Sequence, residues 1–245
     1  MDMTILGLTL SEAVWVPVAA ALFGGVLSLA GAFGATILAN RSARKAREDE
    51  AERLASEVAF IAFFKLLDGY NAAANLKLHI DEMFDAAHEN GHGDMEPWGK
   101  VMQIVGADDV VESIRPSETS FLIHEKKADL LNEVHLIQRR IANILASAGK
   151  YNELRAELQS FLVANSAEAE LGEGTVMSAH FEGTQKFHAD FRMSQLNNLI
   201  GQIMELLDQD LPRSWKALSN FKDAASERYG DYFPKFNAEE NLKRD

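Results

Sequence analysis

The apolar and charged residues divide the chain into an uncharged stretch near the amino terminus and a longer region with helical periodicity. Residues 13–40 (AVWVPVAAALFGGVLSLAGAFGATILAN) form a run of 28 residues without a charged side chain. As a helix rising about 1.5 Å per residue, this run would extend about 42 Å, more than the roughly 30 Å of a bilayer's hydrocarbon core. The pattern predicts a single transmembrane helix over residues 13–40.

A cleaved signal peptide and a buried core helix are the alternatives for this run. A signal peptide carries its positive charge before a short apolar region and has a small-residue cleavage site after it. Here the apolar run is longer, and its basic residues follow it. A buried core helix would rarely continue for 28 residues without a charge or a polar stripe. The transmembrane interpretation is therefore favoured.

The residues directly after the apolar run predict its orientation. Residues 41–47 (RSARKAR) carry four basic side chains and no acidic one, and positively charged flanks stay on the cytoplasmic side. We therefore expect residues 1–12 to be a short extracytoplasmic tail and the chain after Arg41 to be cytoplasmic, with the protein in the cell inner membrane or plasma membrane. The side chains expected to contact membrane lipid headgroups are Arg41, Arg44, Lys45 and Arg47.

Small residues are dense in the predicted transmembrane helix, and they recur with two spacings. One set recurs at every fourth position, which favours a right-handed helix crossing: Ala20, Gly24, Ser28, Ala32 and Thr36. The other alternates steps of three and four, as in a left-handed seam: Ala21, Gly24, Ser28, Gly31 and Ala35. Both patterns predict self-association into a homo-oligomer, and the sequence does not choose between them. The alternative is that small residues are simply common in membrane helices.

The region after the basic cluster predicts helices only. No Gly or Pro occurs between residue 41 and Gly69, so the membrane helix is expected to continue through a basic stalk, residues 41–53, into a helical domain, residues 54–230. Apolar residues at helical spacing and their flanking caps predict these helices: to about Glu89, Asp109 to Pro116, Ser117–Ala148, from Asn152, Thr184 to about Leu211, and Pro212 to about Gly230.

The expected fold is all-α: a single transmembrane helix continuing into a cytoplasmic antiparallel bundle of four or more helices. Residues 165–183 are rich in Gly, Ser and Glu and predict a long loop. The tail, residues 231–245, concentrates Tyr232, Phe233 and Phe236. These aromatic residues either fold back onto the bundle, which we favour, or dock a protein partner.

Charge and composition exclude several classes of protein. Residues 48–245 hold 20 of the 24 Lys and Arg residues and 35 of the 37 Asp and Glu residues, a net charge of −15. Such an acidic domain repels phosphate backbones, so we expect no nucleic-acid partner. The chain has no cysteine, which excludes disulfides and thiolate chemistry.

Seven histidines invite a search for a metal site. The best group is Asp85, His88, His92 and Asp94, in which Asp85 and His88 share a helix face. His92 and Asp94 follow in a Gly-containing loop, and the chain lacks the paired Glu-x-x-His motifs of di-iron bundles. Solvated polar residues at a helix end are therefore the favoured interpretation, with a metal site as the weaker alternative.

Motifs for catalysis and cofactor binding are absent from the sequence. LGEGTV, residues 171–176, lacks the Lys-Ser/Thr of a P-loop, and no Gly-x-Ser-x-Gly occurs. We therefore expect a protein without cofactors that is not an enzyme: a membrane-anchored scaffold or interaction protein that self-associates. One alternative is a membrane effector or sensor whose assembled helices perturb the bilayer. A second alternative is a helical bundle that binds a metal or another ligand.

Overall fold

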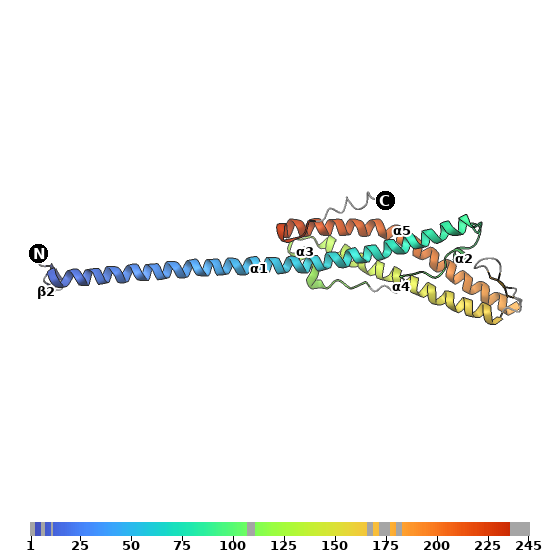
Figure 1. Cartoon of the computed structure of the whole chain (residues 1–245), viewed down its shortest axis with the longest axis horizontal. Coiled ribbons are helices and arrows are strands. Elements are labelled where there is room, and N and C mark those ends of the chain that lie inside the picture. Colours follow the sequence, from blue (N-terminus) through green and yellow to red (C-terminus); the bar gives the residue numbers. More distant parts are fainter. Residues whose placement is uncertain are drawn as a thin grey trace. The chain divides into compact units, whose positions relative to one another are not determined.

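The computed structural model describes residues 3–5, 8–10, 12–106, 111–165, 169–171, 177–179 and 183–235 (Figure 1). It divides into two compact units, Met1–Ala55 and Ser56–Asp245. The described residues are overwhelmingly helical, which confirms the all-α class. Two short antiparallel hairpins, which the sequence did not predict, pair β1 (Met3–Ile5) with β2 (Leu8–Leu10) and β3 (Ala169–Leu171) with β4 (Met177–Ala179).

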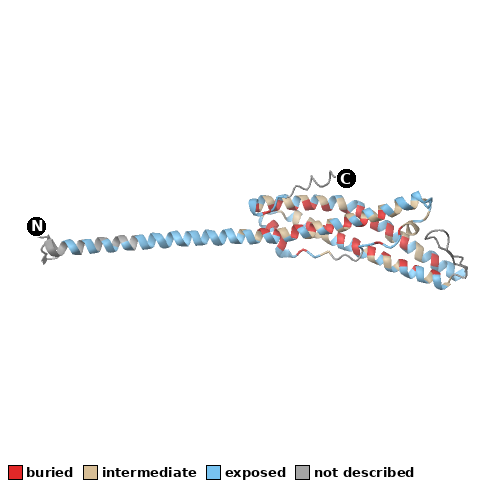
Figure 2. Cartoon of the chain, viewed as in Figure 1, coloured by how far each residue is buried: buried red, intermediate tan, exposed pale blue. Residues whose placement is uncertain are grey.

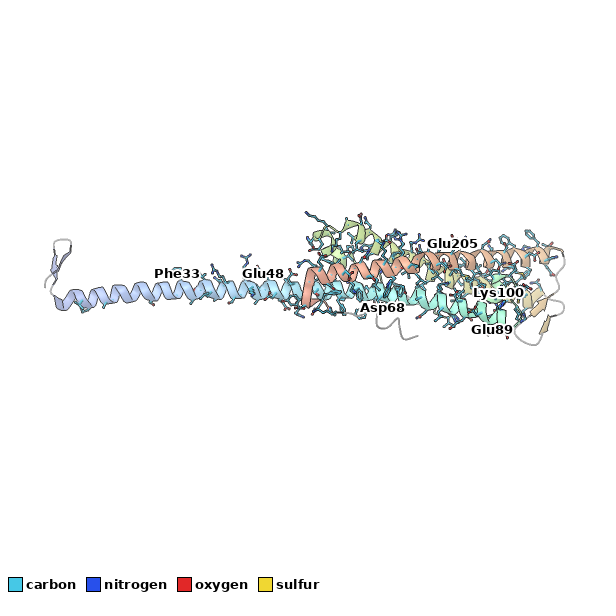
Figure 3. All side chains as sticks on the ribbon, turned by 90° about the horizontal axis from the view of Figure 1, so that it is seen from above. Phe33, Glu48, Asp68, Glu89, Lys100 and Glu205 are labelled. Atoms are coloured by element: carbon cyan, nitrogen blue, oxygen red, sulfur yellow. The ribbon has the colours of Figure 1, made fainter. Side chains whose placement is uncertain are left out.

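Helix α1 (Glu12–Glu89) continues through the predicted stalk without a break and ends where the sequence predicted. In the first unit, every side chain that the structure describes from Val16 to Ala51 is exposed, and this part of α1 is pale blue in Figure 2. The exposed residues include large apolar ones, among them Phe33, which Figure 3 labels on α1, and Leu38.

No helix in the described part of the chain contains a stretch long and apolar enough to cross a membrane. Within the predicted segment 13–40, some side chains lie outside the described ones: those of residues 13–15, 18, 19, 22, 23, 26, 27, 29 and 30. The membrane crossing therefore stays a prediction from the sequence.

The second unit is a bundle of three long helices: the part of α1 after Ser56, α4 (Ala128–Asn165) and α5 (Gly183–Tyr229). In this unit α5 runs opposite to α4, while α1 and α4 run in the same direction (Figure 1). The bundle is thus only partly antiparallel, and its described part has three long helices instead of the four or more that we predicted. Branched aliphatic residues from all three helices form the core, including Ile80, Ile141, Ile144, Ile200 and Ile203.

The helix count differs because two expected helix breaks do not occur. Gly149 was expected to end a helix, but α4 passes through it, since Ala148 and Tyr151 beside it are both buried in the core. Pro212 was expected to begin a helix, but α5 passes through it too. A proline inside a helix removes one backbone hydrogen bond, at a cost of about 3 kcal/mol, so other contacts must hold the helix there.

Ion pairs to α4 hold α5 on both sides of Pro212. On the amino-terminal side, Arg140 Nε donates to both carboxylate oxygens of the buried Asp210 at 2.8 Å. On the carboxyl-terminal side, Arg213 forms an ion pair with Glu133. The Arg213 guanidinium lowers the pKa of the Glu133 carboxyl by hydrogen bonding to it. These contacts explain why the proline is tolerated within one continuous helix.

The connection between α1 and α4 holds three short helices, α2 (Pro97–Lys100), η1 (Pro116–Thr119) and α3 (Ser120–His124). The helix predicted from Asp109 to Pro116 is wrong over residues 111–115, which are irregular, while residues 107–110 lie outside the described ones. The side chain of Gln138 forms hydrogen bonds with the backbone of this segment: its Oε1 accepts from Ile114 N at 3.0 Å, and its Nε2 donates to Glu112 O at 2.6 Å. The helix predicted from Ser117 is also interrupted, at residues 125–127, where Lys126 has a φ of 56°.

Side chains of α4 and α5 hold the backbone of residues 96–106, which has little regular structure. Trp98 N donates to Asn197 Oδ1 at 2.9 Å, and Tyr151 Oη donates to Val101 O at 2.7 Å. Asn152 both donates to and accepts from the backbone of Ile104, at 2.8 Å each way. These contacts fix the connection against the bundle.

The start of the carboxyl-terminal tail folds back onto α1. The Phe233 ring is 1% exposed and packs edge-on against Phe60 and Phe63, with centroids 5.9 and 6.1 Å apart. Ser56 Oγ donates to the carbonyl oxygen of Tyr232 at 2.9 Å. The favoured prediction is therefore confirmed for Phe233, while Tyr232 stays half-exposed and Phe236 lies outside the described residues.

Candidate functional site

An open groove of about 680 Å³ lies beside α1 on the described surface. Two segments form it: α1 contributes Phe60, Ile61, Phe64, Lys65, Asp68 and Ala72, and the irregular segment contributes Val111 and Glu112. The two segments meet at Gly69, where a Cβ would lie 3.4 Å from Val111 Cγ1, an ordinary van der Waals distance. Figure 3 labels Asp68 on this part of α1. We call this hollow the α1 groove.

An ion pair closes one wall of the α1 groove. Lys65 Nζ lies 2.9 Å from Glu118 Oε1, and both side chains are largely buried. Lys65 also donates to Ser113 O at 3.2 Å, and Glu118 Oε2 accepts from Arg115 N at 2.8 Å. Burial raises the pKa of the Glu118 carboxyl, but the hydrogen bonds from Lys65 and Arg115 outweigh burial and leave the pKa below its usual value. Lys65 is thus engaged in the structure and is a poor candidate for a free base.

The lining of the α1 groove is mostly apolar, with Asp68 and Glu112 also exposed there, and Val58 lies beside it on α1. Val58, Ile61 and Phe64 follow each other at three-residue steps on α1 and are 36%, 47% and 41% exposed. The rings of Phe64 and Phe60 pack edge-on with their centroids 4.7 Å apart, and Phe60 also packs against Phe233. A shallow apolar surface with an internally neutralised cation suits the binding of another apolar surface better than acid–base chemistry.

The predicted helix-association residues are exposed in the first unit. All seven have solvent-accessible side chains or backbone: Ala20, Gly24, Ser28, Gly31, Ala32, Ala35 and Thr36. A Cβ built on Gly24 or Gly31 meets no atom within 4 Å. Thr36 Oγ1 donates to Ala32 O at 2.8 Å, so this hydroxyl is satisfied within its own helix. The surface is open to a second helix, and its use for association stays a prediction.

The four predicted headgroup-binding residues, Arg41, Arg44, Lys45 and Arg47, are likewise exposed. One of them has a partner within the helix, because Arg44 Nε lies 2.8 Å from Glu48 Oε1. The hydrogen bond to Glu48 raises the pKa of Arg44 above its usual value. Contact with lipid headgroups is a prediction that this arrangement permits.

The weaker alternative of a metal site gains no support. The described residues contain no group of three or more His, Asp or Glu side chains placed to hold a metal ion. Asp85, His88, His92 and Asp94 are all described and all exposed. The His88 ring lies against the backbone of Gly93, where a Cβ would be 2.8 Å from Nδ1. These four residues are polar groups of a helix end and the turn after it.

Sequence reasoning missed the α1 groove. Val58, Ile61 and Phe64 have the helical spacing of an apolar face that other helices cover. The groove also depends on Val111, in a segment predicted to be helical. Exposure of one side of that apolar face depends on which helices pack where, and the spacing alone does not carry this information.

Comparison of the chain with models of known protein families, with curated proteins and with solved structures found no match. A functional proposal for this chain therefore rests on its own residues.

Proposed function

We propose that this protein is a non-enzymatic, single-pass membrane-anchored scaffold that self-associates and presents its helical bundle to protein partners in the cytoplasm. The observation that carries the proposal is the uncharged run 13–40, followed directly by four basic residues. Such a run is long enough to span a bilayer, and such a flank sets the orientation.

Exposed apolar side chains along α1 are a second observation that supports the proposal. Phe33, Ile37 and Leu38 are exposed large apolar side chains on one helix. Exposed apolar surface of this density is unfavourable in water and favourable in a lipid or protein environment. The bundle contributes the other half of the proposal, since its groove suits binding and the sequence has no catalytic motif.

Extraction of membranes tests the anchor. The full chain, expressed in a bacterial host, should stay in the membrane pellet at alkaline pH, where peripheral proteins are released. The double variant Leu27→Lys, Leu29→Glu should move to the supernatant, because charges in the bilayer centre cost about 2.5–3.5 kcal/mol each. The matched variant Leu27→Val, Leu29→Val should stay in the pellet. Release of the unmodified chain would overturn the anchor.

Orientation is tested by labelling, which the lack of native cysteine simplifies. The variant Ser11→Cys should react with a membrane-impermeant maleimide on intact cells. The variant Ala51→Cys should react only after the cells are permeabilised. The reverse pattern would place the bundle outside, and labelling of both on intact cells would refute a single crossing.

A further inference from the structure

The start of the carboxyl-terminal tail advances along α1 toward the α1 groove. The carbonyl oxygen of Tyr232 accepts a hydrogen bond from Ser56 Oγ at 2.9 Å. The following ring, Phe233, packs against Phe60 and Phe63, which lie one to two helical turns further along α1. The tail and α1 therefore run in the same direction here. Because Phe60 also lines the groove, Phe233 lies at its edge.

The next aromatic residue of the tail is close enough in sequence to enter the groove. Residues 236–245 lie outside the described ones, and Phe236 follows Phe233 by three residues, which an extended chain spans in about 10 Å. On α1, Phe64 lies one turn, about 6 Å, beyond the nearer ring that Phe233 contacts. Phe64 and Ile61 line the groove and are 41% and 47% exposed. Both are thus within reach of Phe236.

An attached tail is a better occupant of the groove than a freely diffusing protein. Phe233 already fixes the start of the tail at the edge of the groove, so docking avoids the loss of translational and rotational freedom that a free partner incurs. A short tether also keeps the local concentration of its ligand in the millimolar range. Lys65, which lines the groove, is bound to Glu118 of its own chain, so the groove offers mainly apolar contacts. A phenylalanine ring suits such a lining.

We propose that the α1 groove is the docking site of this chain's own carboxyl-terminal tail, with the Phe236 ring seated against Ile61 and Phe64. The tail then forms a strap that continues along α1 from the contacts of Phe233. A protein partner would use the groove only by displacing the strap. The groove and the tail both belong to the second unit, so the inference does not depend on the membrane anchor.

Disulfide formation within one chain tests the proposal on the full chain in mild detergent. The variant with Ile61→Cys and Asn237→Cys should form an intramolecular disulfide with mild oxidant. The control pairs Asn237→Cys with Leu78→Cys, which is 58% exposed and about 25 Å beyond Ile61 along α1. Asn237 reaches only about 14 Å from Phe233, so the control should give a several-fold lower yield. Equal yields would overturn the proposal, and a product that is mainly a covalent dimer would instead assign the groove to a second copy and overturn it too.

The rate of thiol labelling gives an independent measurement. In the single variant Ile61→Cys, the strap should slow the reaction with a maleimide, so adding Phe236→Asp should raise the rate several-fold. Phe236→Leu should leave the rate near its original value, and Leu78→Cys should label equally fast with or without Phe236→Asp. An unchanged rate at Ile61→Cys would contradict the strap. Circular dichroism checks that Phe236→Asp remains folded, and deletion of residues 236–245 repeats the test if it does not. The extraction experiment reports separately on the anchor.

Discussion

Phe233 offers the most direct test of how the bundle is completed. Its ring is 1% exposed and contacts Phe60 and Phe63 edge-on. Removing a buried Phe ring typically costs about 3–5 kcal/mol, through lost transfer energy and the cavity left behind. The two edge-on contacts account for part of this cost, at about 0.5–1.5 kcal/mol each. Because Phe233 follows the last helix, its neighbours have room to relax, and we expect Phe233→Ala to cost about 3 kcal/mol.

The measurement is equilibrium unfolding in urea, followed by the helical signal in circular dichroism. The matched control is Tyr232→Ala, an aromatic truncation one residue earlier at a position that is 49% exposed. The control should change the free energy of unfolding by less than about 0.5 kcal/mol, because surface substitutions rarely do more. Phe233→Leu should fall between the two, since it keeps most of the buried apolar volume.

Equal losses for Phe233→Ala and Tyr232→Ala would refute this reasoning, because burial is what distinguishes the two positions. A loss below about 1 kcal/mol for Phe233→Ala would mean that the segment after α5 detaches at little cost and that the core is complete without it. The comparison requires that the slope of the unfolding free energy against urea concentration be the same for each variant, since a changed slope indicates an altered unfolded or native state.

Three further predictions concern the bundle and the anchor. Tyr151→Phe should lower the free energy of unfolding by about 1–2 kcal/mol in the same urea assay, because the Val101 carbonyl loses its buried partner. The folded protein lowers the pKa of the Glu118 carboxyl, so the stability that this carboxylate contributes is complete above about pH 4.5 and is lost as the pH falls through the lower folded pKa. Urea midpoints measured as the pH is lowered below 4.5 should therefore fall less for Glu118→Gln than for the unmodified chain. Replacing Gly24 and Ser28 with Leu should reduce crosslinked dimers in membranes, and an unchanged yield would remove the small-residue surface from self-association.

Local signals predicted the helical class and the ends of some helices. The absence of Gly and Pro from residue 41 to Gly69 correctly predicted an unbroken α1, and Gly230, with a φ of 55°, follows the end of α5 as expected. The loop predicted over residues 90–99 is confirmed for residues 90–96, while residues 97–99 belong to the short helix α2.

The sequence failed where distant contacts override local preference. Gly149 and Pro212 disfavour a helix locally, yet both lie inside one, held by the core and by the ion pairs of Asp210 and Glu133. The segment 111–115 has helix-compatible spacing, but its backbone forms hydrogen bonds with the Gln138 side chain instead. In each case the deciding partner is tens of residues away, so no window along the chain contains it.

The side-chain contacts that hold residues 96–106 have a consequence for the order of folding. Their partners are far along the chain: Asn152 lies 48 residues from Ile104, and Asn197 lies 99 residues from Trp98. Because this connection has few backbone hydrogen bonds of its own, it cannot adopt its native conformation before α4 and α5 have both docked. We therefore expect it to acquire its native shape late, after the three long helices have assembled.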